Sequence, residues 1–476
     1  MQLKTNTATF QGFSTQHKKL ADSTILQILI FFSACSFFLT LGLPSVGEEG
    51  VYTNITLEML YNNDYLTPTL YGVEYYRPPL FNWLNLIVTK VIGAAHVVEA
   101  ARIVNMTATL STAGLLFWFV HNIFAERKLA LLTTAVYLSG DLLFKRGWLA
   151  YADSLFSLCV FAAIMSLWLA LERKQDRWFV VASLSLCAGF LAKVHTIYLF
   201  YTIAGLVLIF KHPHRSYIFR PLSWLMHLAA LLFPFAWAMH VRGGFSDIQA
   251  TATYSQGLFQ WPGFFAYAFH VLIAYPINLI ARFLPASLIA LIALAKRNPQ
   301  QKNTANYKSI QIIFWLVVLN LLLYWLAPSS TIRYILPMYP FISLLIAYVI
   351  LQAGSKILQL TIKLLIAACV LKYLLAICWL PYEHTVYRGN AFKIAIDILA
   401  QTKDQNLYIN DSSSAGLRVA VELNKLRHNQ EPLTLVPQKF QGYVLTAEND
   451  PKLGELRQIY KLRSSKLYLL FNAGSS

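Results

Sequence analysis

The chain has 476 residues, of which 57% are hydrophobic and 13% are charged, and its mean hydropathy is +0.50. These values exclude an ordinary soluble globular protein and are typical of a membrane protein with many spans. The net charge of +17 does not indicate nucleic-acid binding, because the basic residues lie between apolar segments and form no basic stripe or patch. The five cysteines all lie in apolar segments, so neither a disulfide framework nor a cysteine metal site is expected.

Long apolar segments recur along the chain, and each crossing of a membrane needs about 20 apolar residues. We therefore predict a polytopic α-helical membrane protein with about eleven transmembrane helices. The first segment follows a basic N-terminus, and we interpret it as a retained signal anchor. The predicted spans are 24–43, 103–124, 129–145, 154–171, 178–192, 195–210, 221–240, 272–295, 309–327, 335–353 and 358–380.

The segment 80–95 is short, and its polar and apolar residues fall on opposite faces of a helix. Asn82, Asn85 and Thr89 recur along one face, and apolar residues line the other. This spacing predicts an amphipathic helix that lies in the membrane interface. If this helix does not span, the loops richest in Lys and Arg all fall on the cytoplasmic side, as membrane proteins prefer. We therefore expect the loop 44–102 to be external.

The C-terminal part of the chain changes character near Tyr382, where the apolar runs become shorter. Residues 406–426 read as a strand, a polar turn and a helix, and residues 433–437 and 442–449 read as further strands. We predict a transmembrane domain over residues 1–380 and a small external α/β domain over residues 381–476.

The external loop contains the first group of candidate functional residues. Glu48 and Glu49 form a carboxylate pair, which can act as a general base or hold a divalent cation. Solvated loop charges are the alternative interpretation. Arg77 precedes two prolines that fix the backbone, at a height where a guanidinium pairs well with phosphate. Tyrosines crowd the same loop, and they either stack on a sugar or form an aromatic belt; the substrate-lining candidates are Tyr52, Tyr75 and Tyr76.

Further charged residues lie at the ends of predicted spans that face the same side as this loop. Asp153 stands where a span begins, Lys193 interrupts a nearly continuous apolar run, and Arg333 precedes Tyr334. Alternatively, Asp153 caps the helix that follows it, and each cation is an interface anchor. Charged groups at span ends are costly to bury in lipid and are often functional. Their common side suits a lipid-linked phosphate substrate.

The first loop also resembles a known family. The motifs Glu48-Glu49-x-x-Tyr52, Glu58-Met59-Leu60, Asp64-Tyr65-Leu66-Thr67-Pro68 and Arg77-Pro78-Pro79-Leu80-x-x-Trp83 are similar to the first external loop of the GT-C membrane glycosyltransferases. Within that class the loop looks like those of the ArnT-like aminoarabinose transferases and the protein mannosyltransferases. The resemblance implies a GT-C fold, a polyprenyl-phosphate-linked sugar donor and a bacterial cytoplasmic (inner) membrane with the active site and C-terminal domain on the periplasmic side. By the same resemblance, Glu48 stands for the leading catalytic acid, Asp153 for the second acid and Arg77 for the phosphate-binding lysine.

The sequence therefore predicts a glycosyltransferase that moves a sugar from a polyprenyl-phosphate carrier to an acceptor, which is lipid A, another glycolipid, a glycan or a protein. Glu48 and Asp153 are the predicted catalytic residues, and Arg77, Lys193 and Arg333 the predicted ligands of the donor phosphate. Glu49, Tyr52, Tyr75, Tyr76 and Tyr334 are predicted to line the substrate site. Membrane lipids are the other expected partners. A transporter or flippase of a lipid-linked sugar and a non-catalytic scaffold are the alternatives.

Overall fold

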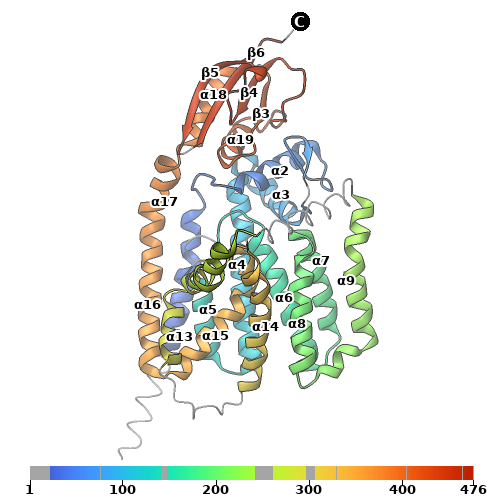
Figure 1. Ribbon diagram of the computed structural model, residues 1–476, viewed down its shortest axis with the longest axis vertical. Coiled ribbons are helices and arrows are strands. Elements are labelled where there is room, and N and C mark those ends of the chain that lie inside the picture. Colours follow the sequence, from blue (N-terminus) through green and yellow to red (C-terminus); the bar gives the residue numbers. More distant parts are fainter. Residues whose placement is uncertain are drawn as a thin grey trace, which may run out of the picture. The chain divides into compact units, whose positions relative to one another are not determined.

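The computed structural model describes residues 22–75, 77–140, 147–241, 261–295, 306–328, 330–403, 405–463 and 465–474. The chain divides into two compact units that each combine distant parts of the sequence. The first contains residues 1–38, 110–146 and 261–373, and the second contains residues 39–109, 147–260 and 374–476. Figure 1 shows the helices and strands that make up the chain.

The first unit consists of helices. Its central helix is α15 (Tyr339–Gln352), which packs against α5 (Arg127–Leu138), α13 (Ala286–Ala295) and α14 (Tyr307–Leu326). The remaining elements are the helix Asp22–Thr40, the C-terminal part of α4 (Val97–Phe124), α11 (Phe264–Phe269), η5 (His270–Ala274), α12 (Tyr275–Arg282), η6 (Ile332–Met338) and α16 (Ser355–Leu374).

The second unit begins with the predicted external loop, which is more ordered than its polar composition suggests. It folds as α2 (Glu49–Asn62), the short hairpin β1 (Thr69–Leu70) and β2 (Val73–Glu74), and α3 (Leu80–Ile92), followed by η2 (Ala94–His96) and the start of α4. α3 confirms that the predicted helix at 80–95 forms. Its polar face is the buried one, with Asn82, Asn85 and Thr89 inside, whereas Ile87 and Val91 are exposed. An exposed apolar face is the arrangement expected of a helix on a membrane surface.

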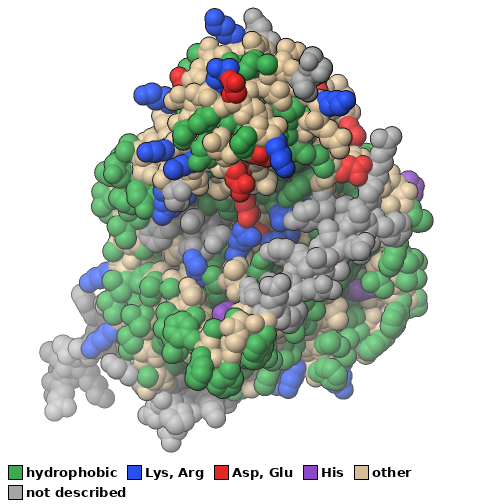
Figure 2. All heavy atoms as spheres, turned by 45° about the horizontal axis from the view of Figure 1, so that its top comes forward, with side chains coloured by type: hydrophobic (Ala, Val, Ile, Leu, Met, Phe, Trp, Pro, Cys, Tyr) green, Lys and Arg blue, Asp and Glu red, His purple; other side chains and the backbone are tan. Residues whose placement is uncertain are grey.

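The helices of the second unit carry long apolar surfaces. α6 (Asp153–Arg173) packs between α7 (Arg177–Lys193) and α8 (Thr196–Lys211), and α9 (Pro221–His240) packs on α7. η4 (Arg215–Phe219) connects α8 to α9. Large apolar side chains on α9 are exposed, including Trp224, Leu228 and Phe235. Hydrophobic side chains also cover wide areas of the face shown in Figure 2.

Among the described residues, eight helices are long and apolar enough to cross a membrane, and shorter apolar helices occur at Leu80–Ile92, Thr196–Lys211 and Ala286–Ala295. The protein is therefore a multi-pass membrane protein. The number of about eleven spans stays a prediction, because it depends on which shorter helices cross.

The C-terminal part of the second unit forms a small α/β domain. Its sheet has the strand order β3-β4-β6-β5, with β3 (Leu407–Asn410) parallel to β4 (Gly442–Thr446) and antiparallel pairing between β4, β6 (Ser465–Asn472) and β5 (Glu455–Leu462). The predicted strand, turn and helix at 406–426 are confirmed as β3 and α19 (Ser414–Leu426). The prediction of a strand at 433–437 is wrong, because this segment forms only an isolated bridge between Leu435 and Ile409. The other elements are η7 (Leu375–Trp379), α17 (Leu380–Tyr382), η8 (Glu383–Tyr387), α18 (Ala391–Thr402) and η9 (Pro451–Leu453).

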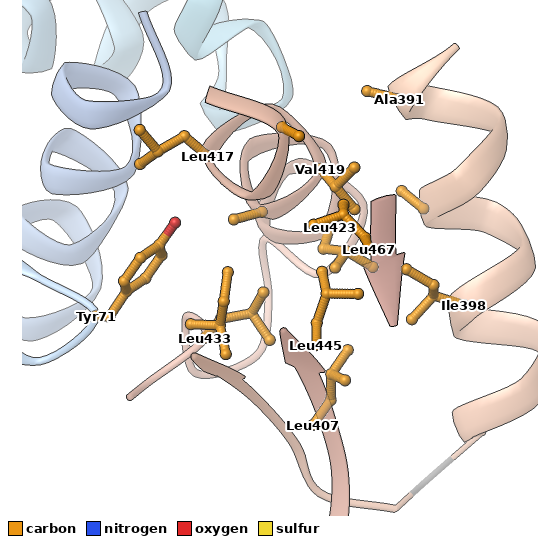
Figure 3. Packing of buried hydrophobic residues seen from close by; sticks show 14 of the residues in the cluster. Tyr71, Ala391, Ile398, Leu407, Leu417, Val419, Leu423, Leu433, Leu445 and Leu467 are labelled. Carbon is orange, nitrogen blue, oxygen red and sulfur yellow. The ribbon is translucent and has the colours of Figure 1, made fainter. Parts of the chain in front are cut away.

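The C-terminal domain and the first loop share one hydrophobic core. Val51, Ile55 and Met59 of α2 and Tyr71 of the hairpin belong to the same buried cluster as residues of α18, α19 and the sheet. Figure 3 shows Tyr71 on the side of this cluster that also carries Leu417 of α19. The loop that carries the candidate acids is thus packed against the C-terminal domain as part of its core.

Candidate functional site

The hydroxyl of Tyr52 is bonded by one predicted residue and affected electrostatically by two others. Tyr52 lies one turn into α2, and its side chain is 5% exposed. Arg77 donates a hydrogen bond from Nη1 to the Tyr52 hydroxyl oxygen at 2.5 Å. Burial raises the pKa of Tyr52; Arg77 opposes this increase, and the carboxylates of Asp153 and Glu48 add to it. Both predicted acids and the predicted phosphate-binding cation therefore act on one buried hydroxyl.

Asp153 and Lys193 form an ion pair between two neighbouring helices. Asp153 is the first residue of α6, Lys193 is the last residue of α7, and Nζ of Lys193 donates to Oδ1 of Asp153. The side chains are 12% and 20% exposed, respectively. An anion at a helix N-terminus and a cation at a helix C-terminus are each favoured by the helix dipole. The pair thus holds a cation beside the acid that acts on Tyr52.

Glu48 and Glu49 are adjacent in sequence but have different surroundings. Glu48 is exposed and precedes α2, whereas Glu49 is completely buried. Oε1 of Glu49 accepts from Nε of Arg102 at 2.9 Å and from the Ala150 amide at 2.9 Å. Its Oε2 accepts from Nη2 of Arg102 at 2.7 Å and from the Val46 amide at 2.8 Å.

These contacts replace the expected substrate-lining role of Glu49 with a structural one. Burial alone would raise the pKa of Glu49, but the charge and hydrogen bonds of Arg102, with those of the two amides, lower it overall. Glu49 is therefore a buried anion whose partners are all protein groups, and Glu48 is the member of the pair that is accessible for chemistry.

Arg102 is a structurally important residue that is not among the candidate residues predicted from the sequence. It is completely buried and lies 5.2 Å from the centroid of the Trp148 ring. The signal that could have revealed it is an arginine within a mostly apolar helix, because a buried cation needs an anionic partner. Glu49 is that partner.

Glu58 holds the β1–β2 hairpin in place. Its carboxylate accepts from the Thr69 hydroxyl at 2.7 Å and from the amides of Tyr71 and Gly72 at 2.6 and 3.1 Å. Burial raises the pKa of Glu58 to about 7, and these hydrogen bonds oppose the increase. The hairpin in turn leads the chain to Arg77, so Glu58 supports the phosphate-binding candidate.

The remaining predicted residues have varied positions. Tyr75 is half-buried, and its ring centroid lies 6.0 Å from the guanidinium carbon of Arg77. Tyr76 lies outside the described residues. Arg333 and Tyr334 belong to η6 in the other unit, where they stack on each other with 5.9 Å between the guanidinium carbon and the ring centroid. Within the described ranges, no three His, Cys, Asp or Glu side chains are grouped as a metal site would need.

Known proteins resemble this chain in both sequence and structure. Residues 76–240 match the family model described as dolichyl-phosphate-mannose-protein mannosyltransferase. A relative from Pectobacterium carotovorum, an undecaprenyl phosphate-alpha-4-amino-4-deoxy-L-arabinose arabinosyl transferase, is 27% identical over 63% of this chain and 54% of its own length. A relative of the same name from Erwinia tasmaniensis is 24% identical over 71% of this chain and 63% of its own length. The chain thus matches little more than half the length of such relatives.

The solved structures decide the fold. ArnT from Cupriavidus metallidurans bound to undecaprenyl phosphate superposes with a TM-score of 0.66 at 14% identity, over 94% of this chain and 97% of that one. The chain has the GT-C fold. The archaeal oligosaccharyltransferase AglB from Archaeoglobus fulgidus matches less closely, with a TM-score of 0.54 at 11% identity, over 90% of this chain and 70% of that one. The predicted fold class and the ArnT-like resemblance of this GT-C chain are confirmed.

Proposed function

We propose that the chain is a glycosyltransferase that moves a sugar from a polyprenyl-phosphate carrier to a lipid, glycan or protein acceptor. The observation that carries the proposal is that two cations are held by hydrogen bonds, with Arg77 donating to the buried Tyr52 hydroxyl and Lys193 donating to Asp153. Together with the exposed acid Glu48, these cations suit a reaction in which a phosphate leaves and a nucleophilic oxygen arrives. The names of the ArnT relatives support the same class of donor.

In the proposed reaction, the bond between the sugar's anomeric carbon and the phosphate oxygen breaks, and a bond to the acceptor oxygen forms. Negative charge develops on the departing phosphate, where Arg77 and Lys193 would stabilise it most. Glu48 accepts the proton when the acceptor is a hydroxyl. Asp153 holds Lys193 in position through their ion pair. Tyr75 and Tyr76 are proposed to line the substrate site, whereas Arg333 and Tyr334, in the other unit, stay predictions from the sequence.

We further propose that residues 1–380 form the transferase domain in a bacterial cytoplasmic membrane and that residues 381–476 are periplasmic. The distribution of Lys and Arg between the loops supports this orientation. The exposed apolar face of α3 is also consistent with the loop lying at a membrane surface.

The test compares membrane lipids and envelope glycans by mass spectrometry in a deletion strain carrying the wild type, Glu48→Gln or Glu74→Gln. Glu74 is an exposed acid of the same loop and serves as the matched control. We expect one sugar mass to disappear in the deletion and to return with the wild type and Glu74→Gln only. Full restoration by Glu48→Gln would remove Glu48 from the chemistry and favour transport of a lipid-linked sugar.

A further inference from the structure

The segment that leads to Glu48 is held from one side by Arg102. Nη1 of Arg102 donates to the carbonyl oxygens of Thr40 and Leu41 at 3.1 and 2.9 Å and also to that of Leu43, and Nη2 donates to that of Pro44 at 3.1 Å. Because the same guanidinium binds Glu49, it fixes both ends of the segment that leads into α2.

A second buried arginine, Arg418 of α19, binds the next carbonyl along this segment. Arg418 is 5% exposed, and its Nε donates to the carbonyl oxygen of Ser45 at 2.8 Å. Its Nη1 donates to Arg388 at 3.1 Å, and its Nη2 donates to Gly389 at 3.0 Å and to His384 at 3.4 Å, all to backbone carbonyl oxygens. Since helix-terminal carbonyls attract cations, Arg418 binds the end of η8 and the segment before Glu48 at the same time.

α2 and α19 are closely packed against each other. A Cβ on Gly50 of α2 would lie 2.7 Å from the carbonyl oxygen of Leu417, which directly precedes Arg418. Further along, Nδ2 of Asn424 donates to Oδ1 of Asn54 at 2.9 Å. α2 and α19 therefore contact each other at two points along their length, and Arg418 adds a third contact at Ser45.

We propose that Arg418 is a positioning residue that holds Glu48 in its reactive place through the carbonyl of Ser45. The inference rests on the proposed function of Glu48 and gives the C-terminal domain a direct part in that function. Glu48 lies three residues beyond Ser45, so a loosened Ser45 carbonyl changes where the carboxylate stands. A displacement of about 1 Å at a reacting group can lower the rate about 100-fold.

The first test measures the kinetics of single variants of the full-length protein reconstituted in lipid nanodiscs. We expect Arg418→Gln to lower kcat about 10- to 100-fold while the KM for the polyprenyl-linked donor stays unchanged, because the phosphate ligands are untouched. Arg418→Lys should not rescue kcat, since one ammonium cannot reproduce the fork that binds several separate carbonyls. Arg427→Gln is the control, because its guanidinium bonds Gln430 within the C-terminal domain.

The decisive comparison is the effect of Arg418→Gln when Glu48 is already Gln. If Arg418 acts through Glu48, the second substitution costs little more; an equal loss in both backgrounds would make Arg418 merely structural and overturn the proposal. Hydrogen–deuterium exchange of residues 40–52 gives an independent readout that needs no activity. Faster exchange there in Arg418→Gln, but not in Arg427→Gln, would show that Arg418 holds this segment. That result would stand even if Glu48→Gln proves fully active, because full activity would refute only the catalytic role of Glu48. Unchanged exchange in that segment would refute the proposal that Arg418 holds it in place.

Discussion

Replacing Glu49 by Gln should destabilise the protein strongly, whereas the same change at Glu48 should not. Both side chains of the Glu49–Arg102 pair are 0% exposed, and Nη2 lies 2.7 Å from Oε2. Removing one member of such a pair leaves an uncompensated buried charge and costs about 3–5 kcal/mol. Glu48 is exposed, and a surface substitution changes the unfolding free energy by about 0.5 kcal/mol or less.

The assay is reversible unfolding of the purified protein in mixed detergent micelles, monitored by tryptophan fluorescence, for wild type, Glu48→Gln and Glu49→Gln. The double variant Glu49→Gln/Arg102→Gln should lose less than the sum of the single losses, because neither partner is then left charged and alone. The lowered pKa of Glu49 means that its contribution persists above its ordinary value of 4.5 and is lost as the pH falls below it. A loss under about 1 kcal/mol for Glu49→Gln would show that the pair is not the buried structural contact described here.

Three further predictions concern the same unit. The pKa of Glu58 is raised from 4.5 to about 7, so the folded protein binds this proton more tightly than the unfolded chain. The free energy of unfolding should therefore fall by about 3 kcal/mol as the pH rises from 4.5 to 7, at about 1.4 kcal/mol per pKa unit. The unfolding free energy of Glu58→Gln should lack this pH dependence, and an identical dependence would contradict the assignment. Arg77→Gln should lower kcat/KM for the donor at least about 100-fold and Arg77→Lys less, because charge at the phosphate matters beyond fork geometry; equal effects in a donor-transfer assay would argue against a phosphate contact. Asp153→Asn should resemble Lys193→Gln in that assay, with non-additive losses in the double variant, because the two side chains form one ion pair; full additivity would mean that they act separately.

The sequence predicted the fold class and α3 because both leave periodic or compositional signals. α3 alternates polar and apolar residues at helical spacing, and long apolar runs identify membrane helices. α2 escaped prediction although it begins at Glu49, directly after Glu48. Most of its residues are buried, polar and apolar alike, since it lies between α3 and α19. A helix covered on several sides shows no amphipathic pattern, and its polar residues suggested an irregular loop.

The candidate site was predictable as a set of residue types but not as a set of roles. The family resemblance separated Glu48 from Glu49, but the residue types alone do not show that Glu49 is buried, because that depends on which carboxylate meets Arg102, more than fifty positions away. Tyr52 was one of several tyrosines, and only the fold places its hydroxyl on Arg77. Arg418 had the weakest signal, since it lies in a C-terminal segment with no family motif.

The packing of the first loop against the C-terminal domain explains why this site depends on tertiary contacts. A loop of this length would lose considerable conformational entropy on ordering, and the burial of Val51, Ile55 and Met59 in the C-terminal core offsets that loss. The two buried arginines then fix the remaining freedom of the segment before Glu48 by binding its carbonyl groups in sequence. A proposed catalytic carboxylate can therefore stay exposed to substrate while its backbone is held rigidly, which is what catalysis by positioning requires.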